Sequence, residues 1–493
     1  MTGGLIQLVS VGYEDLFLSA DPEITYFKMV YKRHTNFSQE AVIQMFNTSA
    51  DFGKRVTCSI AKTADLLSNL YIYVEIPEIP KVYNGTVESS IDKFKWSKKL
   101  GYALINYIEL EINGQLVDKL YGDWMNIWSI LSVTDDRKTE NIMIGNIPEL
   151  YEASNGKSSH KIYIPVNFFF SKNKGLALPL IALHLSDIKI HVEFNSLENV
   201  LIASPTHYIT IDEYIVHFKE GEILTQNIAG TDVNVIYNGF DYTTRRLYYT
   251  KYNDSLQYYT TSSKYLKTKY KVYNSTGYYV MPTSTETSYI VSYPNISLND
   301  ANLIVNFIYL DNLERKKFAT SNHEYLITSL SYSGEQTVYN THTKIKLSFI
   351  NPSKELIWVC QFNKIKNGFI KDKFNYTSNL ESTGENIITK NSIHQNGQVR
   401  SLEEDKYLYN YLISYLYHSG SSEEGINLYS YSLDPENYQP KGSCNFSKID
   451  DLVIELSLSS LISYSNPALL RVYNYNYNVL RITDGLSGLT FVN

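Results

Sequence analysis

The stretch NGQLVDKLYGDW, residues 113–124, has a counterpart far along the chain in NGQVRSLEEDKYLYN, residues 396–410. Each begins with Asn-Gly-Gln, continues into charged residues and Tyr, and lies between strand-like segments. The recurrence is either chance or the mark of two copies of one architecture. The residues around each turn decide between these alternatives.

Alternation of apolar and polar residues dominates the sequence. In YIELEING (107–114), Ile108, Leu110 and Ile112 fall on one face before the chain turns at Asn113-Gly114. This period of two is typical of half-buried strands in antiparallel sheets. The same alternation occurs in IKIHVEF (188–194), KIKLSF (344–349) and DLVIELSLS (451–459).

Helical patterns are few, and the two clearest ones follow the two Asn-Gly-Gln turns. DWMNIWSIL (123–131) places Trp124, Ile127, Trp128 and Leu131 on one helical face, with Asp123 as a plausible N-cap. DKYLYNYLISYLY (405–417) is the second candidate. A helix after each turn favours the two-copy interpretation.

Many short strands separated by frequent turns predict a β-sandwich or barrel, and a jelly roll has eight strands, named B to I here. The second half begins near residues 323–334 and ends near 469–482. Residues 219–301 are too long for a structureless connection and are predicted to be a folded β-insertion between H and I. The first half gives B within 24–47, C and D within 54–77, E 102–113, F 161–170, G 178–194, H 208–218 and I 302–310.

Composition narrows the class of protein. The chain has 493 residues, and its net charge of -7 argues against wrapping nucleic acid, which needs a basic face. Three cysteines, at 58, 360 and 444, form no CxxC motif and indicate a reducing compartment without a zinc site. No signal peptide or membrane span is expected, because the longest apolar run, GLALPLIAL (175–183), is short. The chain is therefore expected to be soluble and intracellular where it is made.

Candidate catalytic clusters are weak, and we predict no catalytic, cofactor-binding or metal-binding residues. Two strands carry acid–histidine patterns, and adjacent glutamate pairs occur in the second half, but polar faces of exposed strands and solvated loops account for them much better than a metal site or a catalytic pair does. No nucleotide-binding or hydrolase motif is present. The residues considered for catalytic or metal-binding roles are His184, Asp187, His191, Glu193, Asp212, Glu213, His217, Glu403-Glu404 and Glu423-Glu424.

Several segments resemble the major capsid proteins of nucleocytoplasmic large DNA viruses. The longest is GGLIQLVSVGYEDLFLSADPEITYFKMVYKRHTNFSQE (3–40), and YGDWMNIW (121–128) is closest to the amoebal-virus members. Other matching segments are GLALPLIALH (175–184), YLDNLERKKFATSNHEYLI (309–327), CNFSKIDD (444–451) and NYNVLRITDGLSGLTFVN (476–493).

This resemblance implies an all-β double jelly roll, in which two tandem eight-stranded antiparallel sandwiches carry short helices in their loops. It implies an arm at residues 1–23, a first jelly roll at 24–313 and a second jelly roll with a C-terminal tail at 314–493. The insertion at 219–301 would then form an external tower. Asn113 and Asn396 would occupy comparable turns.

The implied function is structural. Three chains would form a pseudo-hexagonal capsomer that tiles an icosahedral shell, assembled in the host cytoplasm and located in the virion. Expected partners are other copies of the chain, neighbouring capsomers and minor capsid proteins beneath the shell, with host glycans at the outward loops and no direct nucleic acid. The arm is expected either to contact other shell proteins or to pack on its own barrel. Its candidate assembly contacts are Leu5, Ile6, Leu8, Phe17 and Leu18.

Two alternatives remain open. The chain is a minor capsid paralogue of the same fold, which copy number in virions would reveal. Otherwise it is a carbohydrate-binding or carbohydrate-cleaving β-sandwich, which would show an aromatic groove and, if catalytic, a carboxylate pair with perturbed pKa values.

Overall fold

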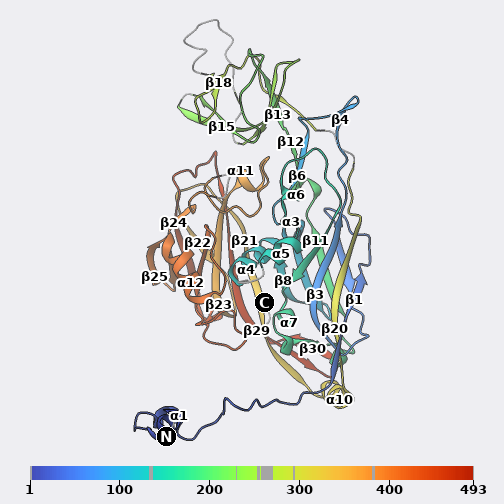
Figure 1. Ribbon diagram of the computed structural model, residues 1–493, viewed down its shortest axis with the longest axis vertical. Coiled ribbons are helices and arrows are strands. Elements are labelled where there is room, and N and C mark those ends of the chain that lie inside the picture. Colours follow the sequence, from blue (N-terminus) through green and yellow to red (C-terminus); the bar gives the residue numbers. More distant parts are fainter. Residues whose placement is uncertain are drawn as a thin grey trace.

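The computed structural model describes residues 3–132, 137–228, 230–252, 256, 270–291, 295–379 and 383–491. Two β-sandwiches stand side by side, with a third β-rich unit above them and an extended N-terminal segment below (Figure 1). The first sandwich comes from the N-terminal half and the second from the C-terminal half. The all-β fold predicted from the alternating pattern is confirmed.

The first sandwich consists of two four-stranded layers. In one, β1 (Phe37–Met45), β20 (Asp300–Leu310), β3 (Leu66–Ile76) and β9 (His160–Val166) pair in that order, and the short β10 (Leu178–Pro179) also pairs with β3. In the other, the order is β2 (Arg55–Ser59), β11 (Ile188–Phe194), β7 (Ile105–Ile112) and β8 (Gln115–Tyr121). We letter the eight sandwich strands B to I in chain order, so that they are β1, β2, β3, β7, β8, β9, β11 and β20. The two layers then read B-I-D-G and C-H-E-F.

The second sandwich repeats this order. One layer runs β21 (His323–Val338), β29 (Ala468–Thr483), β23 (Pro352–Phe362) and β26 (Ile426–Ser430). The other runs β22 (His342–Leu347), β28 (Leu452–Leu458), β24 (Ile388–Gln395) and β25 (Gln398–Asp405). These layers are again B-I-D-G and C-H-E-F, so the chain contains two copies of one architecture.

Each Asn-Gly-Gln turn joins strand E to strand F of its own sandwich. Asn113 and Gly114 have φ values of 53° and 77°, and Asn396 and Gly397 have 48° and 76°. Two successive positive φ values are what a two-residue hairpin turn needs and what Asn-Gly supplies. Each asparagine also donates its backbone N–H, at 2.8 Å, to the carbonyl of the Asp that precedes strand H, Asp187 or Asp451.

Three strand assignments from the sequence were wrong. Strand F is residues 115–121, the second arm of the Asn-Gly hairpin, so the strand expected as F is G and the strand expected as G is H. The strand expected as H, at 208–218, belongs to the upper unit. Strand F was missed because apolar and polar residues do not alternate cleanly in QLVDKLY. The pairing of β8 with β7 shifts register between Leu110 and Glu111 of β7.

The upper unit is a seven-stranded sheet with its own small core. The expected folded β-insertion is confirmed, but its sheet begins at β13 (His207–Thr210), upstream of residue 219. Ile209, Leu224, Val235 and Leu247 pack inside it. Its strand order is β18 (Tyr279–Val280), β17 (Val272–Tyr273), β14 (Ile223–Ile228), β15 (Thr231–Asp241), β16 (Arg246–Lys251), β13 and β19 (Thr287–Ser288).

The two predicted helices are present at equivalent places. α4 (Gly122–Ser132) follows β8, and a π-helical turn, η4 (Tyr407–Leu412), continues into α12 (Ile413–Tyr417) after β25. The remaining helices are short and lie either in the N-terminal arm or in connections between strands. Those used below are α1 (Gly3–Val9), α2 (Leu16–Ser19), α7 (Phe169–Lys172), α10 (Asn312–Thr320) and α11 (Asn363–Lys366).

One continuous hydrophobic cluster runs through both sandwiches. It includes Ile108 and Trp128 from the first and Ile357 and Tyr473 from the second. Each Å² of apolar surface removed from water contributes roughly 25 cal/mol to the free energy of folding. The two sandwiches therefore pack on each other and stabilise each other below the upper sheet.

Candidate functional site

An extensive set of aromatic and buried polar contacts lies at the seam between the two sandwiches. There α4 of the first sandwich packs against β29 of the second. Trp124 and Trp128 are one helical turn apart and point to the same side. The ring of Trp124 lies 5.6 Å from that of Tyr473, and the ring of Trp128 lies 4.9 Å from that of Tyr475. The helical spacing of the two tryptophans thus places both on one partner strand.

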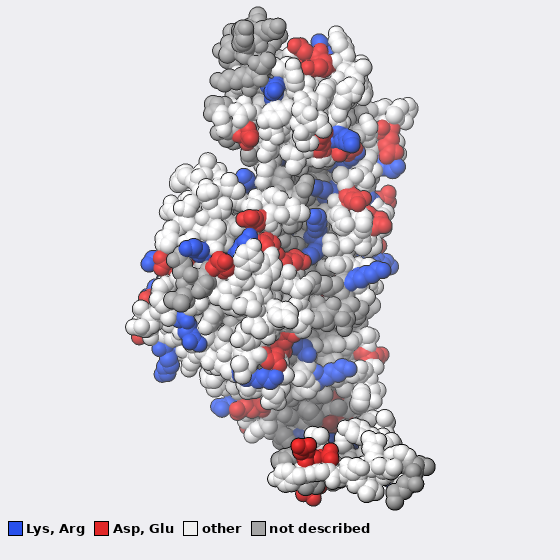
Figure 2. Space-filling view, turned by 60° about the vertical axis from the view of Figure 1, so that its left-hand side comes forward, with Lys and Arg blue, Asp and Glu red and all other residues white. Residues whose placement is uncertain are grey.

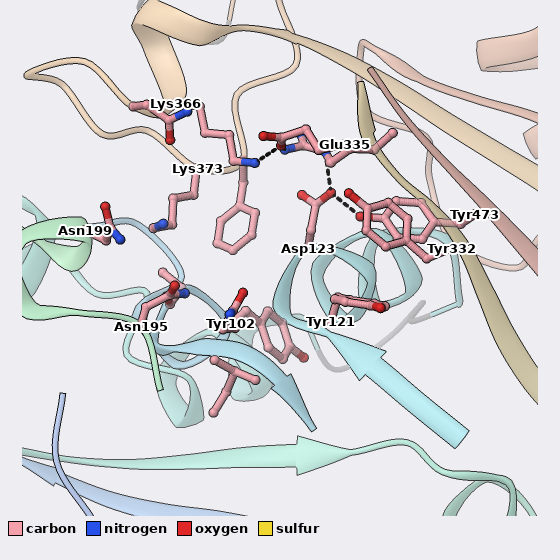
Figure 3. A pocket seen from close by; sticks show the side chains of 16 residues that line it. Tyr102, Tyr121, Asp123, Asn195, Asn199, Tyr332, Glu335, Lys366, Lys373 and Tyr473 are labelled. Carbon is pink, nitrogen blue, oxygen red and sulfur yellow. Dashed lines mark hydrogen bonds and ion pairs between the residues drawn. The ribbon is translucent and has the colours of Figure 1, made fainter. Parts of the chain in front are cut away.

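A buried ion-pair network closes one end of the seam (Figure 3). Asp123, in the first turn of α4, accepts hydrogen bonds from the hydroxyls of Tyr376, at 2.6 Å, and Tyr473, at 2.7 Å. Arg471 Nε lies 3.0 Å from Asp123 Oδ2, and Arg471 Nη1 lies 3.1 Å from Glu335 Oε2. The Asp123 carboxylate is thereby engaged by three groups of the second sandwich.

Cations gather beside this network around a cavity of about 340 Å³. Burial lowers the pKa of Arg471, but Asp123 and its neighbours more than offset this and hold it above its ordinary value. Burial, with Lys366 and Arg471 nearby, lowers the pKa of Lys373 to about 8. Lys366 pairs with Glu335. Asp123 is fully engaged, so it is positioned to hold the sandwiches together and not to act as a general base.

A second polar cluster lies further along the seam. Lys172, at the end of α7, donates a 2.9 Å hydrogen bond to Tyr475 and sits 4.3 Å from the centre of the Trp128 ring. Burial lowers its pKa to about 8 and raises that of nearby Asp118 to about 6. Asp118 Oδ1 also accepts the backbone N–H of Leu330 at 3.0 Å, which ties β8 to β21.

His418 forms the far end of this cluster, between two carboxylates. Its Nε2 lies 2.9 Å from Glu355 Oε2 and its Nδ1 lies 3.1 Å from Glu436 Oε1. Burial favours the neutral imidazole, but the two carboxylates outweigh burial and raise the pKa of His418 to about 9. His418 is therefore a cation at neutral pH, held edge-on beside Trp128.

The acid–histidine patterns of the sequence are not brought together into a reactive cluster. His191 is nearly buried between Thr57, at 2.8 Å, and Glu111, at 3.1 Å, while Glu193 accepts a hydrogen bond from Asn106. In the upper unit, Glu213 accepts the Met281 backbone N–H. Among the described residues, no group of three or more His, Cys, Asp and Glu side chains is arranged to hold a metal ion.

The adjacent glutamate pairs and the three cysteines were the other candidate groups, and those that the structure describes form ordinary ion pairs or remain free thiols. Glu423 and Glu424 pair with Lys99 and Lys406. The side chains of Glu403 and Glu404 fall outside the described residues. The three cysteines are free thiols.

The candidate assembly contacts of the N-terminal arm lie at the lower end of the molecule, away from the upper sheet (Figure 1). Leu5 and Ile6 of α1 are each 52% exposed, Leu8 is 74% exposed and Leu18 of α2 is 91% exposed. The side chain of Phe17 lies outside the described part of the chain. The described arm residues are thus open to solvent and do not pack on the chain's own sandwich.

The surface is mixed in charge. On the face shown in Figure 2, acidic and basic side chains are interspersed over a mostly uncharged surface. In the part of the chain that the structure describes, no helix is long and apolar enough to cross a membrane.

Sequence reasoning missed Arg471 as the centre of the seam. The available signal was a lone arginine inside the aromatic and apolar run ALLRVYNYNY of β29. A buried cation in such a strand needs an anionic partner, but the sequence does not show which. Its partners, Asp123, Glu335 and Gln361, come from three distant segments.

Two adjoining sandwiches with layers B-I-D-G and C-H-E-F define the chain as a double jelly-roll protein. Solved structures share this fold. The Faustovirus major capsid protein matches with a TM-score of 0.68 at 13% identity, covering 96% of this chain and 94% of that one. The quasi-atomic PBCV-1 virus capsid matches with a TM-score of 0.63 at 23% identity, covering 95% and 100%.

Sequence comparisons then give the family. Residues 25–234 match "Major capsid protein N-terminus" and residues 314–488 match "Large eukaryotic DNA virus major capsid protein". The chain is 38% identical to "Probable capsid protein 4" of Acanthamoeba polyphaga mimivirus, over 100% of this chain and 99% of that one. It is 29% identical to the major capsid protein of Phaeocystis pouchetii virus, over the whole of both. The chain belongs to the major capsid protein family of large eukaryotic DNA viruses.

This membership confirms the predicted resemblance and the structural role. The chain is a capsid protein of the virion and not an enzyme, as the family and its relatives are capsid proteins.

Proposed function

We propose that three copies of this chain form a pseudo-hexagonal capsomer, and that such capsomers tile an icosahedral shell. The observation that carries this proposal is the repeat of one sandwich within the chain. The buried seam fixes the two sandwiches side by side, so three chains around an axis supply six similar units. A closed ring of identical contacts is a standard form of oligomer.

The two ends of the molecule support an orientation in that shell. We divide the chain into an arm, residues 1–23, and two jelly rolls, residues 24–313 and 314–493. The upper sheet would face outward, where host glycans are candidate ligands, and the exposed arm would face inward toward minor capsid proteins and neighbouring capsomers (Figure 1). Assembly would take place in the host cytoplasm, without direct contact to nucleic acid.

Native mass spectrometry of the purified chain, with negative-stain images of the same sample, tests this function. A species of three chains with a six-cornered outline is the expected result. A chain that stays monomeric at all concentrations contradicts autonomous trimer formation. Copy number in purified virions separates the major shell protein from a minor paralogue, for which we expect far fewer copies.

A further inference from the structure

The helix face that α4 buries at the seam has an equivalent in the second sandwich, and that equivalent face is exposed. Trp124 and Trp128 follow the turn residue Asn113 at the same two distances in sequence at which Tyr407 and Tyr411 follow Asn396. The two tryptophans are 2% and 6% exposed because they lie against β29. Tyr407 and Tyr411 are 63% and 39% exposed. The second sandwich thus presents the equivalent helix with its aromatic side uncovered.

The uncovered side of η4–α12 is a continuous apolar face. Leu412, Tyr415 and Leu416 extend it, with exposed fractions of 49%, 83% and 58%. A groove of about 580 Å³ lies along this face. Tyr409 and Ile413 on the opposite side are buried in their own sandwich, which holds the helix in a fixed orientation.

The surface that receives α4 also has an uncovered equivalent. In the second sandwich, α4 packs on the outer side of layer B-I-D-G at strand β29. In the first sandwich, the outer side of the same layer is open, and a row of apolar residues crosses it from β1 to β9: Ile43, Ile304, Tyr71 and Pro165 are directly opposed in register. The next row carries Met45 and the ring pair Tyr73–Tyr163, with centroids 5.3 Å apart.

The two uncovered surfaces lie at opposite ends of the pair of sandwiches. In Figure 1, α12 is at the left edge and β1 is at the right edge. Ile43 is 62% exposed and Met45 is 78% exposed. Large apolar side chains clustered on a monomer surface mark contact sites. Each chain therefore holds one helix face and one sheet face that match the two sides of its internal seam.

We propose that the η4–α12 face of one copy packs on the outer side of β1-β20-β3-β9 of a second copy. This contact repeats between chains the contact that α4 makes within the chain. It is heterologous, since different surfaces meet, and such contacts generate rings when the rotation closes. The assignment rests on the proposed trimer and names the residues that hold it together.

Site-specific cross-linking tests the pairing of the two faces. Chains carrying Tyr415→Cys are mixed with chains carrying Met45→Cys and treated with a short bis-maleimide. Mixed dimers that join the two variants are expected. Each variant alone should cross-link no more than the wild type, in which Cys58 and Cys360 are buried and the half-buried Cys444 sets the background. Equal cross-linking within one variant would overturn the heterologous pairing.

Charge substitutions give a second measurement. Tyr415→Glu and Met45→Glu should each lower the trimer fraction at a fixed concentration at least tenfold. Leu313→Glu, in α10 and 83% exposed, is the matched control and should leave the trimer unchanged. Circular dichroism and melting temperature check that all three variants fold, which we expect because the replaced side chains are exposed.

The outcomes separate this contact from the trimer itself. A wild-type trimer that survives both substitutions and gives no mixed cross-link overturns this contact and leaves the proposed function standing. Mixed cross-links in an oligomer that is not a trimer support the contact and overturn the threefold capsomer. A monomer without cross-links overturns both.

Discussion

At the scale of single residues, the seam depends on Arg471. Its guanidinium is 2% exposed and faces Asp123, Glu335 and Gln361. Breaking a buried ion pair by removing one partner leaves the other charge uncompensated in a poorly solvated place.

Replacing Arg471 by Met should therefore lower the free energy of unfolding by about 3–5 kcal/mol. Chemical denaturation followed by tryptophan fluorescence measures this change. Arg481→Met is the matched control on the same strand, since Arg481 and Glu324 form an exposed pair. Its expected cost is at most about 1 kcal/mol. Equal costs for the two variants would contradict the role given to the buried network.

His418 predicts a pH dependence of stability. Its pKa is raised from 6.5 to about 9 in the folded chain, so its contribution is fully present below about pH 6.5. That contribution is lost as the pH rises through about 9, where the folded imidazole releases its proton. The difference in unfolding free energy between the wild type and His418→Gln should be largest near pH 6 and smallest above pH 9. A difference that does not change with pH would refute the buried cation.

At the scale of elements, the two E–F hairpins depend on their glycines. Gly114 and Gly397 have φ values of 77° and 76°, and a Cβ added at either would meet open space. The cost of an added methyl group is thus backbone strain alone. Left-handed conformations cost non-glycine residues roughly 1–2 kcal/mol.

Gly114→Ala and Gly397→Ala should each lower the free energy of unfolding by about 1–2 kcal/mol. Similar values for both would reflect the equivalence of the two turns. Gly488→Ala is the control, since its Cβ also meets open space and its φ is not in the left-handed region. We expect no loss of stability there, and a loss equal to that of the turn variants would show that strain is not the cause.

At the scale of the whole molecule, the N-terminal arm is separate from the folded body. Its described residues are exposed, and α1 buries none of its side chains. Deleting residues 2–23 should leave the melting temperature and the oligomeric state unchanged, while lowering the yield of closed shells in an assembly reaction. Calorimetry and electron microscopy measure these effects. A large fall in melting temperature would show that the arm packs on its own chain.

Local residues were enough to predict most of the sandwich strands, the two turns and the two helices. Asn-Gly fixes a tight turn by its φ preference, and alternation fixes which strand face is buried, so both can be read without knowing the partner strand. Residues 115–121 were missed as a strand because their alternation is interrupted where the register shifts. The family resemblance was carried by long matching segments and was confirmed by the comparisons.

The residue patterns alone therefore predict a repeated all-β architecture, its hairpin turns and its capsid family. Which helix and sheet faces are buried depends on how the two sandwiches pack together. Trp124 and Tyr407 occupy equivalent positions, yet one is enclosed and the other is exposed, because only the first helix has a second sandwich beside it. Arg471 likewise becomes the centre of the seam through partners distant in sequence. Periodicity records the environment of a strand or helix, but contacts between distant segments depend on how the finished elements pack.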